Sequence, residues 1–161
     1  MGVAGCGKSS LGARLALATG GRLIEGDDYH GAANREKMRQ GIALTDADRE
    51  DWLETLGGLL RSHPRGSVLT CSALKKAYRD KLRSAQPGLT FLHLKIGRGD
   101  SQRRVAARAG DHFFSASLVD SQFAALEPPD GEPGVLVLDA MQPLPELTAR
   151  AMEWLDERER A

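Results

Sequence analysis

The stretch GVAGCGKS, residues 2–9, matches the phosphate-binding pattern G-x-x-x-x-G-K-[ST] at every position. Its three glycines permit backbone angles that turn successive N–H groups toward phosphate oxygens. The helix expected near Lys8 directs its positive end to the same place, Lys8 adds a mobile charge, and Ser9 can place its hydroxyl on Mg²⁺. The stretch predicts a nucleoside triphosphate site, and an ordinary glycine-rich turn is the alternative. GTPases, motor ATPases and small-molecule kinases all carry such a loop.

The rest of the chain predicts an α/β fold. Short apolar runs alternate with amphipathic stretches, which is typical of βαβ units with a parallel sheet and helices on both faces. Strands are expected at residues 22–25, 67–71, 89–94 and 134–138. Helices are expected directly after the loop, from a cap at Thr45 onward, and at 34–40, 74–83, 101–110, 117–126 and 144–159. A phosphate loop also requires a strand in front of it, but only Met1 precedes Gly2.

The length and composition of the chain bear on its number of domains, its partners and its location. The chain has 161 residues, which predicts a single domain over 1–161. Its 22 basic and 22 acidic residues cancel, so we expect neither nucleic acid nor a membrane as the main partner. No apolar run approaches the ~20 residues of a membrane span. The two cysteines, Cys6 and Cys71, form no disulfide framework, which favours a reducing, cytoplasmic location.

The polar segments at 25–38 and 44–53 predict an acceptor site. They follow strand 22–25, at the carboxyl edge of the expected sheet, where open α/β folds bind ligands. A kinase of a small alcohol needs a carboxylate to accept the hydroxyl proton. An arginine such as Arg49 suits a substrate carboxylate. A solvated charged loop is the alternative for these segments when taken alone.

Several motifs together resemble one family, the gluconate kinases (gluconokinases), which belong to the nucleoside-monophosphate and shikimate kinase-like branch of P-loop kinases. The most specific of them is CSALKK-x-YRD-x-LR at 71–83, and the resemblance covers essentially the whole chain. The other motifs are GVAGCGKS (2–9), GDDYH (26–30), N-x-x-K-M (34–38), L-x-D-x-D-R-x-x-W-L (44–53), HFF (112–114), SQFAALEPP (121–129) and VLVLD (135–139). The resemblance implies a three-layer P-loop kinase fold.

The resemblance also implies roles for individual residues. Asp27 would orient and deprotonate the sugar-acid hydroxyl, and Arg49 would hold the substrate carboxylate. Lys8 and Arg108 join Asp27 as catalytic residues, and Ser9 is the metal ligand. The remaining substrate-binding residues are His30, Lys37, Lys75 and Gln122. The nucleotide-binding residues are Gly2, Val3, Ala4, Gly5, Cys6, Gly7, Lys8, Ser9, Ser10, Arg104 and Arg108, the two arginines lying in a lid segment at about 104–116.

Two departures from common patterns are informative. Glu25 stands where the family commonly has aspartate, near the expected water shell of Mg²⁺. No aspartate ends the strand expected at 67–71, which argues against a motor ATPase or GTPase and agrees with this branch of kinases.

The leading hypothesis is the transfer of a phosphoryl group from ATP, with Mg²⁺, to D-gluconate. A kinase of another small acid, with shikimate the nearest, is an alternative that the CSALKK run disfavours. The second alternative is a non-catalytic or truncated nucleotide-binding relative.

In the family the strand before the loop is central, and unpaired buried backbone groups cost ~1–3 kcal/mol each. We therefore expect the chain either to be strongly destabilised or to lack an upstream segment of about five apolar residues. The resemblance further implies a homodimer, although the residues indicate no interface.

Overall fold

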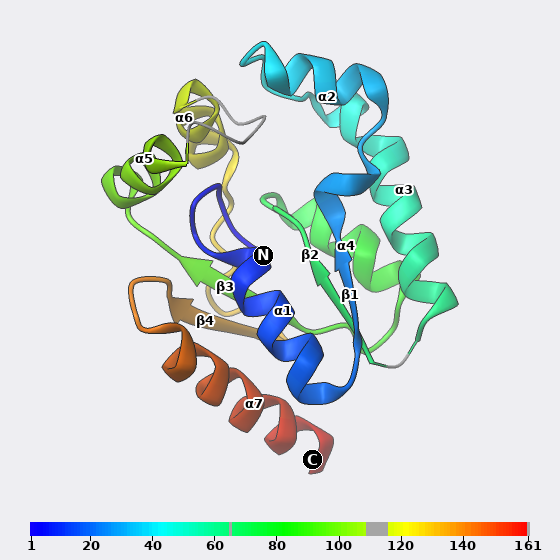
Figure 1. The fold of residues 1–161 in the computed structure, drawn as a ribbon. Coiled ribbons are helices and arrows are strands. Elements are labelled where there is room, and N and C mark those ends of the chain that lie inside the picture. The colour runs from blue at the N-terminus through cyan, green and yellow to red at the C-terminus, as the bar shows by residue number, and fades with distance from the viewer. Residues whose placement is uncertain (65, 109–115, 161) are drawn as a thin grey trace.

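The computed structural model describes residues 1–64, 66–108 and 116–160 and has helices and strands in alternation (Figure 1). The strands are β1 (Arg22–Glu25), β2 (Ser67–Thr70), β3 (Phe91–Lys95) and β4 (Val135–Asp139). The helices are α1 (Lys8–Thr19), the short 3₁₀ helix η1 (Gly26–Tyr29), α2 (Ala32–Arg39), α3 (Asp46–Ser62), α4 (Lys76–Ala85), α5 (Arg98–Ala107), α6 (Ala116–Ala125) and α7 (Leu144–Arg160). This order confirms the predicted parallel α/β fold.

The strands form two parallel pairs, with the start of the chain between them. β1 pairs with β2, and β3 pairs with β4, both in parallel. The amino group of Met1 donates to the Leu92 carbonyl at 2.6 Å, and the Leu94 N–H donates to the Met1 carbonyl at 3.0 Å. On the other side, the Gly2 N–H donates to the Ser72 carbonyl at 3.1 Å. Met1 and Gly2 therefore lie between β3 and the end of β2, where the sequence predicts a central strand (Figure 1).

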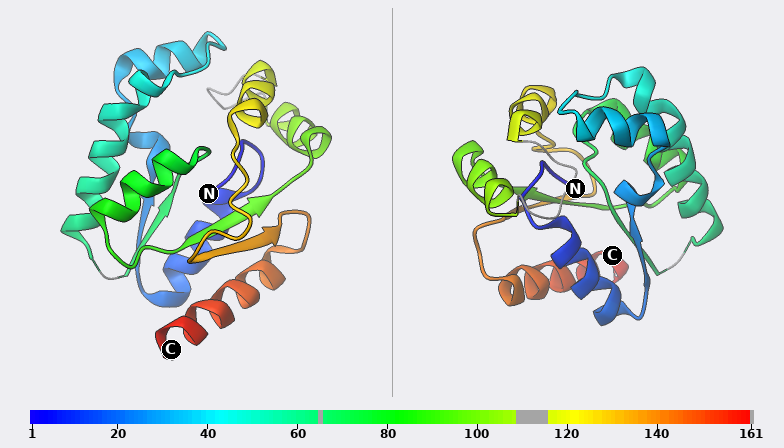
Figure 2. Two further views of the ribbon diagram at one scale, coloured as in Figure 1. Left: turned by 180° about the vertical axis from the view of Figure 1, so that it is seen from behind. Right: turned by 45° about the horizontal axis from the view of Figure 1, so that its top comes forward.

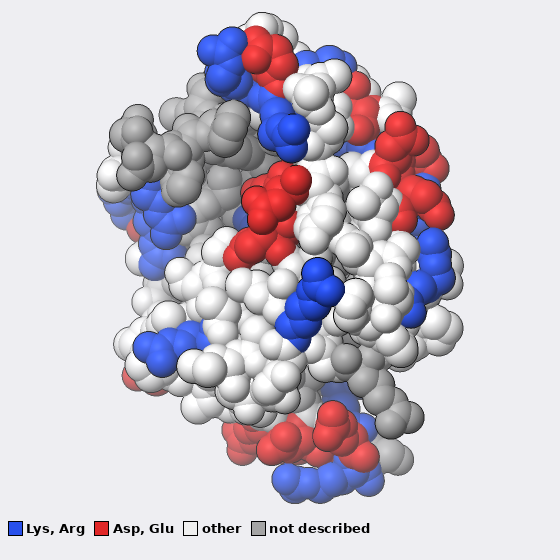
Figure 3. All heavy atoms as spheres, turned by 45° about the vertical axis from the view of Figure 1, so that its right-hand side comes forward, with Lys and Arg blue, Asp and Glu red and all other residues white. Residues whose placement is uncertain are grey.

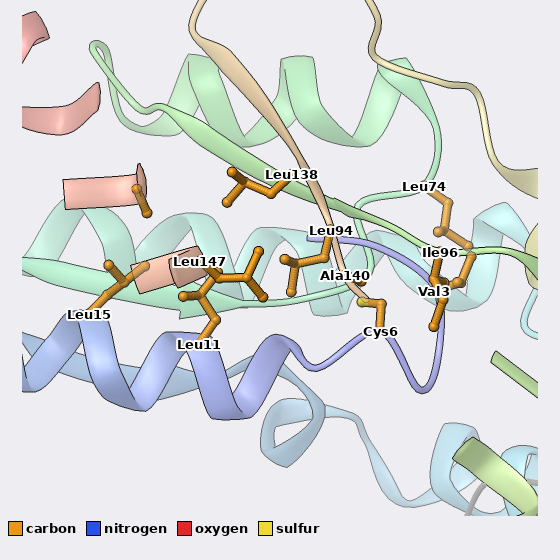
Figure 4. Packing of buried hydrophobic residues seen from close by; sticks show 11 residues of the cluster. Val3, Cys6, Leu11, Leu15, Leu74, Leu94, Ile96, Leu138, Ala140 and Leu147 are labelled. Carbon is orange, nitrogen blue, oxygen red and sulfur yellow. The ribbon is translucent and has the colours of Figure 1, made fainter. Parts of the chain in front are cut away.

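Two apolar clusters place helices on both faces of these strands. In the first, Leu11 and Leu15 of α1 and Leu147 of α7 pack against Leu94 of β3 and Leu138 of β4 (Figure 4). The second contains buried residues of α3, α4, β3 and the segment after β2: Trp52, Leu53, Leu56, Leu60, Cys71, Ala73, Tyr78, Leu82 and Phe91. Figure 2 shows α1 and α7 on one side of the strands and α3 and α4 on the other. The result is the expected three-layer arrangement.

Local sequence predicts the start of α3 but not the starts of all helices. The predicted cap at Thr45 is confirmed, because its hydroxyl accepts from the Asp48 N–H and the Asp48 carboxylate accepts from the Thr45 N–H. The 3₁₀ turn η1 is not predicted by the sequence. Helix α2 begins at Ala32, two residues before the expected start, and α5 begins at Arg98 rather than residue 101.

The segment before α4 differs from the prediction for a physical reason. The helix expected at 74–83 begins only at Lys76, because Lys75 is extended, with a φ of −92° and a ψ of 148°, and Ala73 before it has a φ of 43°. The fully buried guanidinium of Arg79 donates to the Ala73 carbonyl at 3.0 Å and to the Leu74 carbonyl at 2.9 Å. These bonds hold residues 72–75 in a turn that a helix would not allow.

Arg79 also joins this turn to the segment before β4. Its guanidinium donates to the Glu127 carbonyl at 3.1 Å and forms an ion pair with the Glu132 carboxylate. The hydrogen bond from Arg79 is the main cause that lowers the pKa of Glu132 below its ordinary value. A residue of the basic-looking stretch 74–83 is therefore a buried structural group.

Two surface properties bear on partners. No helix among the described residues is long and apolar enough to cross a membrane. On the face drawn in Figure 3, lysine and arginine side chains alternate with aspartate and glutamate in small mixed groups. Among the described residues drawn there, Lys and Arg side chains form no extended basic patch.

Candidate active site

A cavity of about 770 Å³ opens beside the phosphate loop. Helices α5 and α6 lie on one side of the loop, and η1, α2 and α3 lie on the other (Figures 1 and 2). The cavity brings together most of the predicted site residues. Those that line it are Ala4, Gly5, Gly7, Lys8, Ser9, Ser10, Asp27, His30, Arg49, Lys75, Arg108 and Gln122.

The phosphate loop presents its backbone, and two of its side chains point away from the cavity. Gly7 occupies the N-cap of α1 with a φ of 97°, a conformation that favours glycine. Val3 and Cys6 are buried in the first apolar cluster, so only their peptide groups can serve the predicted nucleotide site. The Lys8 ammonium donates to the Val3 carbonyl at 3.0 Å and so lies folded back over the loop.

Three oxygen-bearing side chains converge at the start of α1. The hydroxyls of Ser9 and Thr70 both donate to the same oxygen of the Glu25 carboxylate, at 3.0 and 2.5 Å. Hydroxyl and carboxylate oxygens are the hard ligands that Mg²⁺ prefers, and Mg²⁺ usually takes few protein ligands and keeps several waters. The residues present therefore fit the predicted Ser9 metal site, with Glu25 and Thr70 beside it.

Asp27 lies at the carboxyl end of β1, on η1, and its side chain is 76% exposed. His30 follows at the end of η1, with its Nε2 at 4.0 Å from the Asp27 Oδ1. The His30 ring is buried and stacks on Trp52, with 4.4 Å between ring centroids. Burial lowers the pKa of His30 to about 4, against the raising effect of Asp27. A neutral imidazole therefore stands beside the candidate base, and its Nδ1 has no partner among the described residues.

The opposite wall carries a group of cations and aromatic rings. The Arg49 guanidinium lies 6.0 Å from the centroid of the Trp52 ring and 5.8 Å from that of Tyr78. Within the described parts of the chain it has no ion-pair partner, whereas the Lys75 ammonium contacts both oxygens of the Asp46 carboxylate at 2.7 and 2.9 Å. The Tyr78 hydroxyl also donates to Asp46. Arg49 is therefore the free cation of this wall.

Asp46 and Tyr78 also belong to the site, although the sequence alone does not predict a role for them there. Both line the cavity, and both occur in motifs that carried the family resemblance, at 44–53 and 71–83. Only the fold shows that α3 and α4 pack together and bring these two motifs into contact.

Five predicted site residues do not line the cavity: Gly2, Val3 and Cys6 of the loop, and Lys37 and Arg104. Lys37 donates instead to the Asp48 carboxylate at 2.6 Å, where it supports the cap of α3. Arg104 donates to the Gly5 carbonyl at 3.3 Å and to the Ala140 carbonyl at 3.1 Å, so it links the phosphate loop to the loop after β4. Arg108 ends α5 with an exposed side chain. The rest of the expected lid, residues 109–115, lies outside the described residues.

The buried histidines predict that stability depends on pH. Burial lowers the pKa of both His30 and His93 to about 4, from an ordinary value of 6.5. Between these values the unfolded chain binds protons that the folded chain does not, so folding is weakened as pH falls below 6.5. We expect the free energy of unfolding to drop by up to about 1.4 kcal/mol per pH unit for each histidine. Urea denaturation at about pH 7 and about pH 5.5 measures this effect.

His93→Leu supplies the comparison for this measurement. Leucine cannot bind a proton, so this variant should lose less stability between the two pH values than the unmodified protein. Equal stability of the unmodified protein at both pH values would contradict the expectation.

A phosphate loop that begins between parallel strands, beside a cavity with a carboxylate and an unpaired arginine, defines a P-loop kinase of a small molecule. No family model matches the chain. The chain is 44% identical to the gluconokinase of Gluconobacter oxydans (strain 621H), over 89% of this chain and 82% of that protein. It is 40% identical to the thermoresistant gluconokinase of Escherichia coli (strain K12), over 95% and 89%. The crystal structure of a gluconokinase from Sinorhizobium meliloti 1021 superposes with a TM-score of 0.86 at 43% identity, over 98% and 94% of the two chains. The chain belongs to the gluconokinase family.

Proposed function

We propose that this protein transfers the γ-phosphoryl group of ATP to the 6-hydroxyl of D-gluconate, giving ADP and 6-phospho-D-gluconate. The observation that carries the proposal is a single cavity lined by the phosphate loop, the exposed carboxylate of Asp27 and the unpaired guanidinium of Arg49. These three features suit the three parts of the reaction, which are a triphosphate, a hydroxyl and a carboxylate. The gluconokinase relatives at about 40% identity support the same substrate.

Each residue has a separate task in the proposed transfer. The loop N–H groups and Lys8 bind the phosphates, with Lys8 leaving the Val3 carbonyl to reach them. Asp27 accepts the proton as the gluconate hydroxyl oxygen bonds to the γ-phosphorus. The bond from that phosphorus to the bridging oxygen breaks, and the electron pair leaves with ADP. Arg108 adds positive charge near the transferred group, where charge spreads in the transition state.

The Ser9 group would hold the metal ion in this scheme. Ser9 would bind Mg²⁺ directly, with Glu25 and Thr70 ordering the water around it. Mg²⁺, when bound, neutralises charge on the phosphate oxygens.

The remaining polar residues set the charge of the acceptor site. Asp46 neutralises Lys75, so Arg49 is left to pair with the one carboxylate of gluconate. His30, held neutral by burial, can exchange hydrogen bonds with gluconate hydroxyls without adding a charge. Gln122 and Lys75 face the same space. An acceptor site in which the Arg49 guanidinium is not paired with a carboxylate of the described chain suits a polyhydroxylated acid.

An assay of ADP release over a panel of sugar acids and shikimate tests the proposal. Turnover of gluconate well above that of the other acids is the expected result. Turnover of shikimate without gluconate would contradict the proposed substrate. Binding of ATP with no turnover of any acid would favour the non-catalytic alternative.

Arg49→Met should raise the KM for gluconate by roughly 10- to 100-fold, because a hydrogen bond to a charged group contributes ~1.5–3 kcal/mol. The KM for ATP should change little, because the phosphate loop is untouched. Steady-state kinetics with gluconate and with its neutral analogue glucitol checks this. The variant should lose its preference for gluconate over glucitol, and a preserved preference would show that Arg49 does not bind the carboxylate.

We further propose a cytoplasmic homodimer. Both cysteines are free and buried, which suits a reducing compartment. The dimer rests on the family resemblance alone. Light scattering on the purified protein measures its mass, and a monomer at working concentration would contradict this part.

A further inference from the structure

Two helices that come much later in the sequence, α5 and α6, hold the phosphate loop at Ala4. The Ala4 N–H donates to the Gln122 side-chain oxygen at 2.6 Å. The Ser101 hydroxyl donates to the Ala4 carbonyl at 2.8 Å. Ser101 belongs to α5 and Gln122 to α6. Both polar groups of one loop residue are therefore taken up by side chains that lie outside the loop.

The loop packs closely against α5, and the Gln122 amide can bond to Ala4 in only one orientation. Ser101 is fully buried, and a Cβ atom added at Gly5 would stand 2.9 Å from the Ser101 carbonyl oxygen. The loop backbone thus lies directly on α5, where a larger residue than glycine would force the two apart. The Gln122 amide must present its oxygen to Ala4, because a backbone N–H can only donate. Its nitrogen then has no hydrogen-bond partner in the part of the chain that the structure describes, and Gln122 lines the cavity.

We propose that Ser101 and Gln122 are positioning residues that preset the phosphate loop for nucleotide by fixing the N–H and the carbonyl of Ala4. A loop that is already ordered loses less conformational freedom when phosphate binds, so affinity rises without a new contact to the ligand. The Ala4 N–H, being engaged by Gln122, leaves phosphate binding to the N–H groups that follow it in the loop. The Gln122 amide also connects the loop to the acceptor cavity, because its oxygen bonds to Ala4 while the residue lines the cavity. The proposal depends on the nucleotide site and not on the identity of the acceptor.

The test compares nucleotide affinity in Gln122→Met and Ser101→Ala with that of the unmodified protein. Each variant removes one hydrogen bond and preserves much of the side-chain volume. We expect the Kd for ADP, measured by isothermal titration calorimetry, to rise roughly 3- to 10-fold in each, as the loss of one hydrogen bond implies. The KM for ATP should rise by a similar factor. In Ser101→Ala the KM for gluconate should stay within about 2-fold, because Ser101 does not line the cavity.

Gln102→Ala is the matched control. Gln102 is a glutamine of α5 whose side chain donates to the Asp120 carboxylate of α6 at 3.1 Å. This hydrogen bond joins the same two helices but does not involve the loop. Its removal should leave the Kd for ADP unchanged. A melting temperature close to that of Gln102→Ala, together with weaker ADP binding in Gln122→Met, separates positioning from general loss of stability.

Two results would overturn the proposal. An unchanged Kd for ADP in Gln122→Met would show that the loop needs no support from α6, even where Ser101→Ala fails to fold. A raised KM for gluconate with unchanged ADP affinity would make Gln122 a substrate ligand only. Because ADP binding is measured without acceptor, an error in the proposed substrate would appear in the acid panel and leave this test intact.

Discussion

Replacing Asp27 by asparagine is expected to lower kcat for gluconate phosphorylation by ~10²–10⁴-fold, the usual contribution of a general base. Asparagine keeps the shape of the side chain but cannot take the hydroxyl proton. The Asp27 carboxylate is exposed to the cavity and stands at the end of β1, so its replacement should not disturb the core. The Kd for ADP should therefore stay the same. Single-turnover kinetics at saturating ATP and gluconate measures the effect on the chemical step.

Asp28→Asn is the control for this variant. Asp28 is the next residue on η1, and its side chain is exposed and also lines the cavity. A general loss of negative charge would affect both variants, whereas loss of a base affects Asp27 alone. Near-normal turnover by Asp27→Asn, or an equal loss in Asp28→Asn, would remove Asp27 from the proposed role.

Arg79→Ala is expected to destabilise the fold by ~3–5 kcal/mol, the cost of breaking a buried ion pair by removing one partner. The change takes Arg79 from the mostly buried Glu132 carboxylate, which keeps Arg83, and removes the guanidinium donor from the carbonyls of Ala73 and Leu74. The Leu74 carbonyl then keeps the Glu127 N–H. For a chain of this size the melting temperature should fall by roughly 2–4 °C per kcal/mol. Urea denaturation followed by circular dichroism checks the free energy, provided that the variant folds.

Arg39→Ala gives the exposed counterpart. Arg39 also forms an ion pair with a glutamate, Glu36, but their side chains are 64% and 48% exposed. Exposed pairs contribute ~0–1 kcal/mol, so this variant should be nearly neutral. A loss in Arg79→Ala no larger than that in Arg39→Ala would show that the Arg79 guanidinium does not hold the turn at residues 72–75.

Stretches of neighbouring residues made the phosphate loop, the helix caps and the strands predictable. The loop is a run of eight residues whose backbone angles and charge are set within the run itself. The capping box joins Thr45 to Asp48, which are three residues apart. The helix expected at 74–83 began at Lys76 because a side chain from further along the chain, Arg79, holds the turn before it.

The pairing of charges could not be predicted, because it depends on which elements pack together. Lys75 pairs with Asp46, which lies 29 residues earlier on a different helix. Arg79 looked like one cation of a basic helix until Glu132, 53 residues later, proved to be its buried partner. The periodicity of the sequence predicts which face of a helix is apolar. It does not predict which carboxylate of a neighbouring element will pair with a lysine or arginine of that helix.

By itself, the sequence determined that this protein has a parallel α/β fold, a phosphate loop and the motifs of the gluconokinase family. Each of these features depends on a short segment of sequence, because the backbone geometry and hydrogen bonds that define it form within that segment. The tertiary structure alone decided that Arg49 has no ion-pair partner among the described residues, that Lys37 supports a helix cap, and that Ser101 and Gln122 hold Ala4. Ala4 and Gln122 are 118 residues apart, and only the packing of α5 and α6 against the phosphate loop brings their hydrogen-bonding groups within reach.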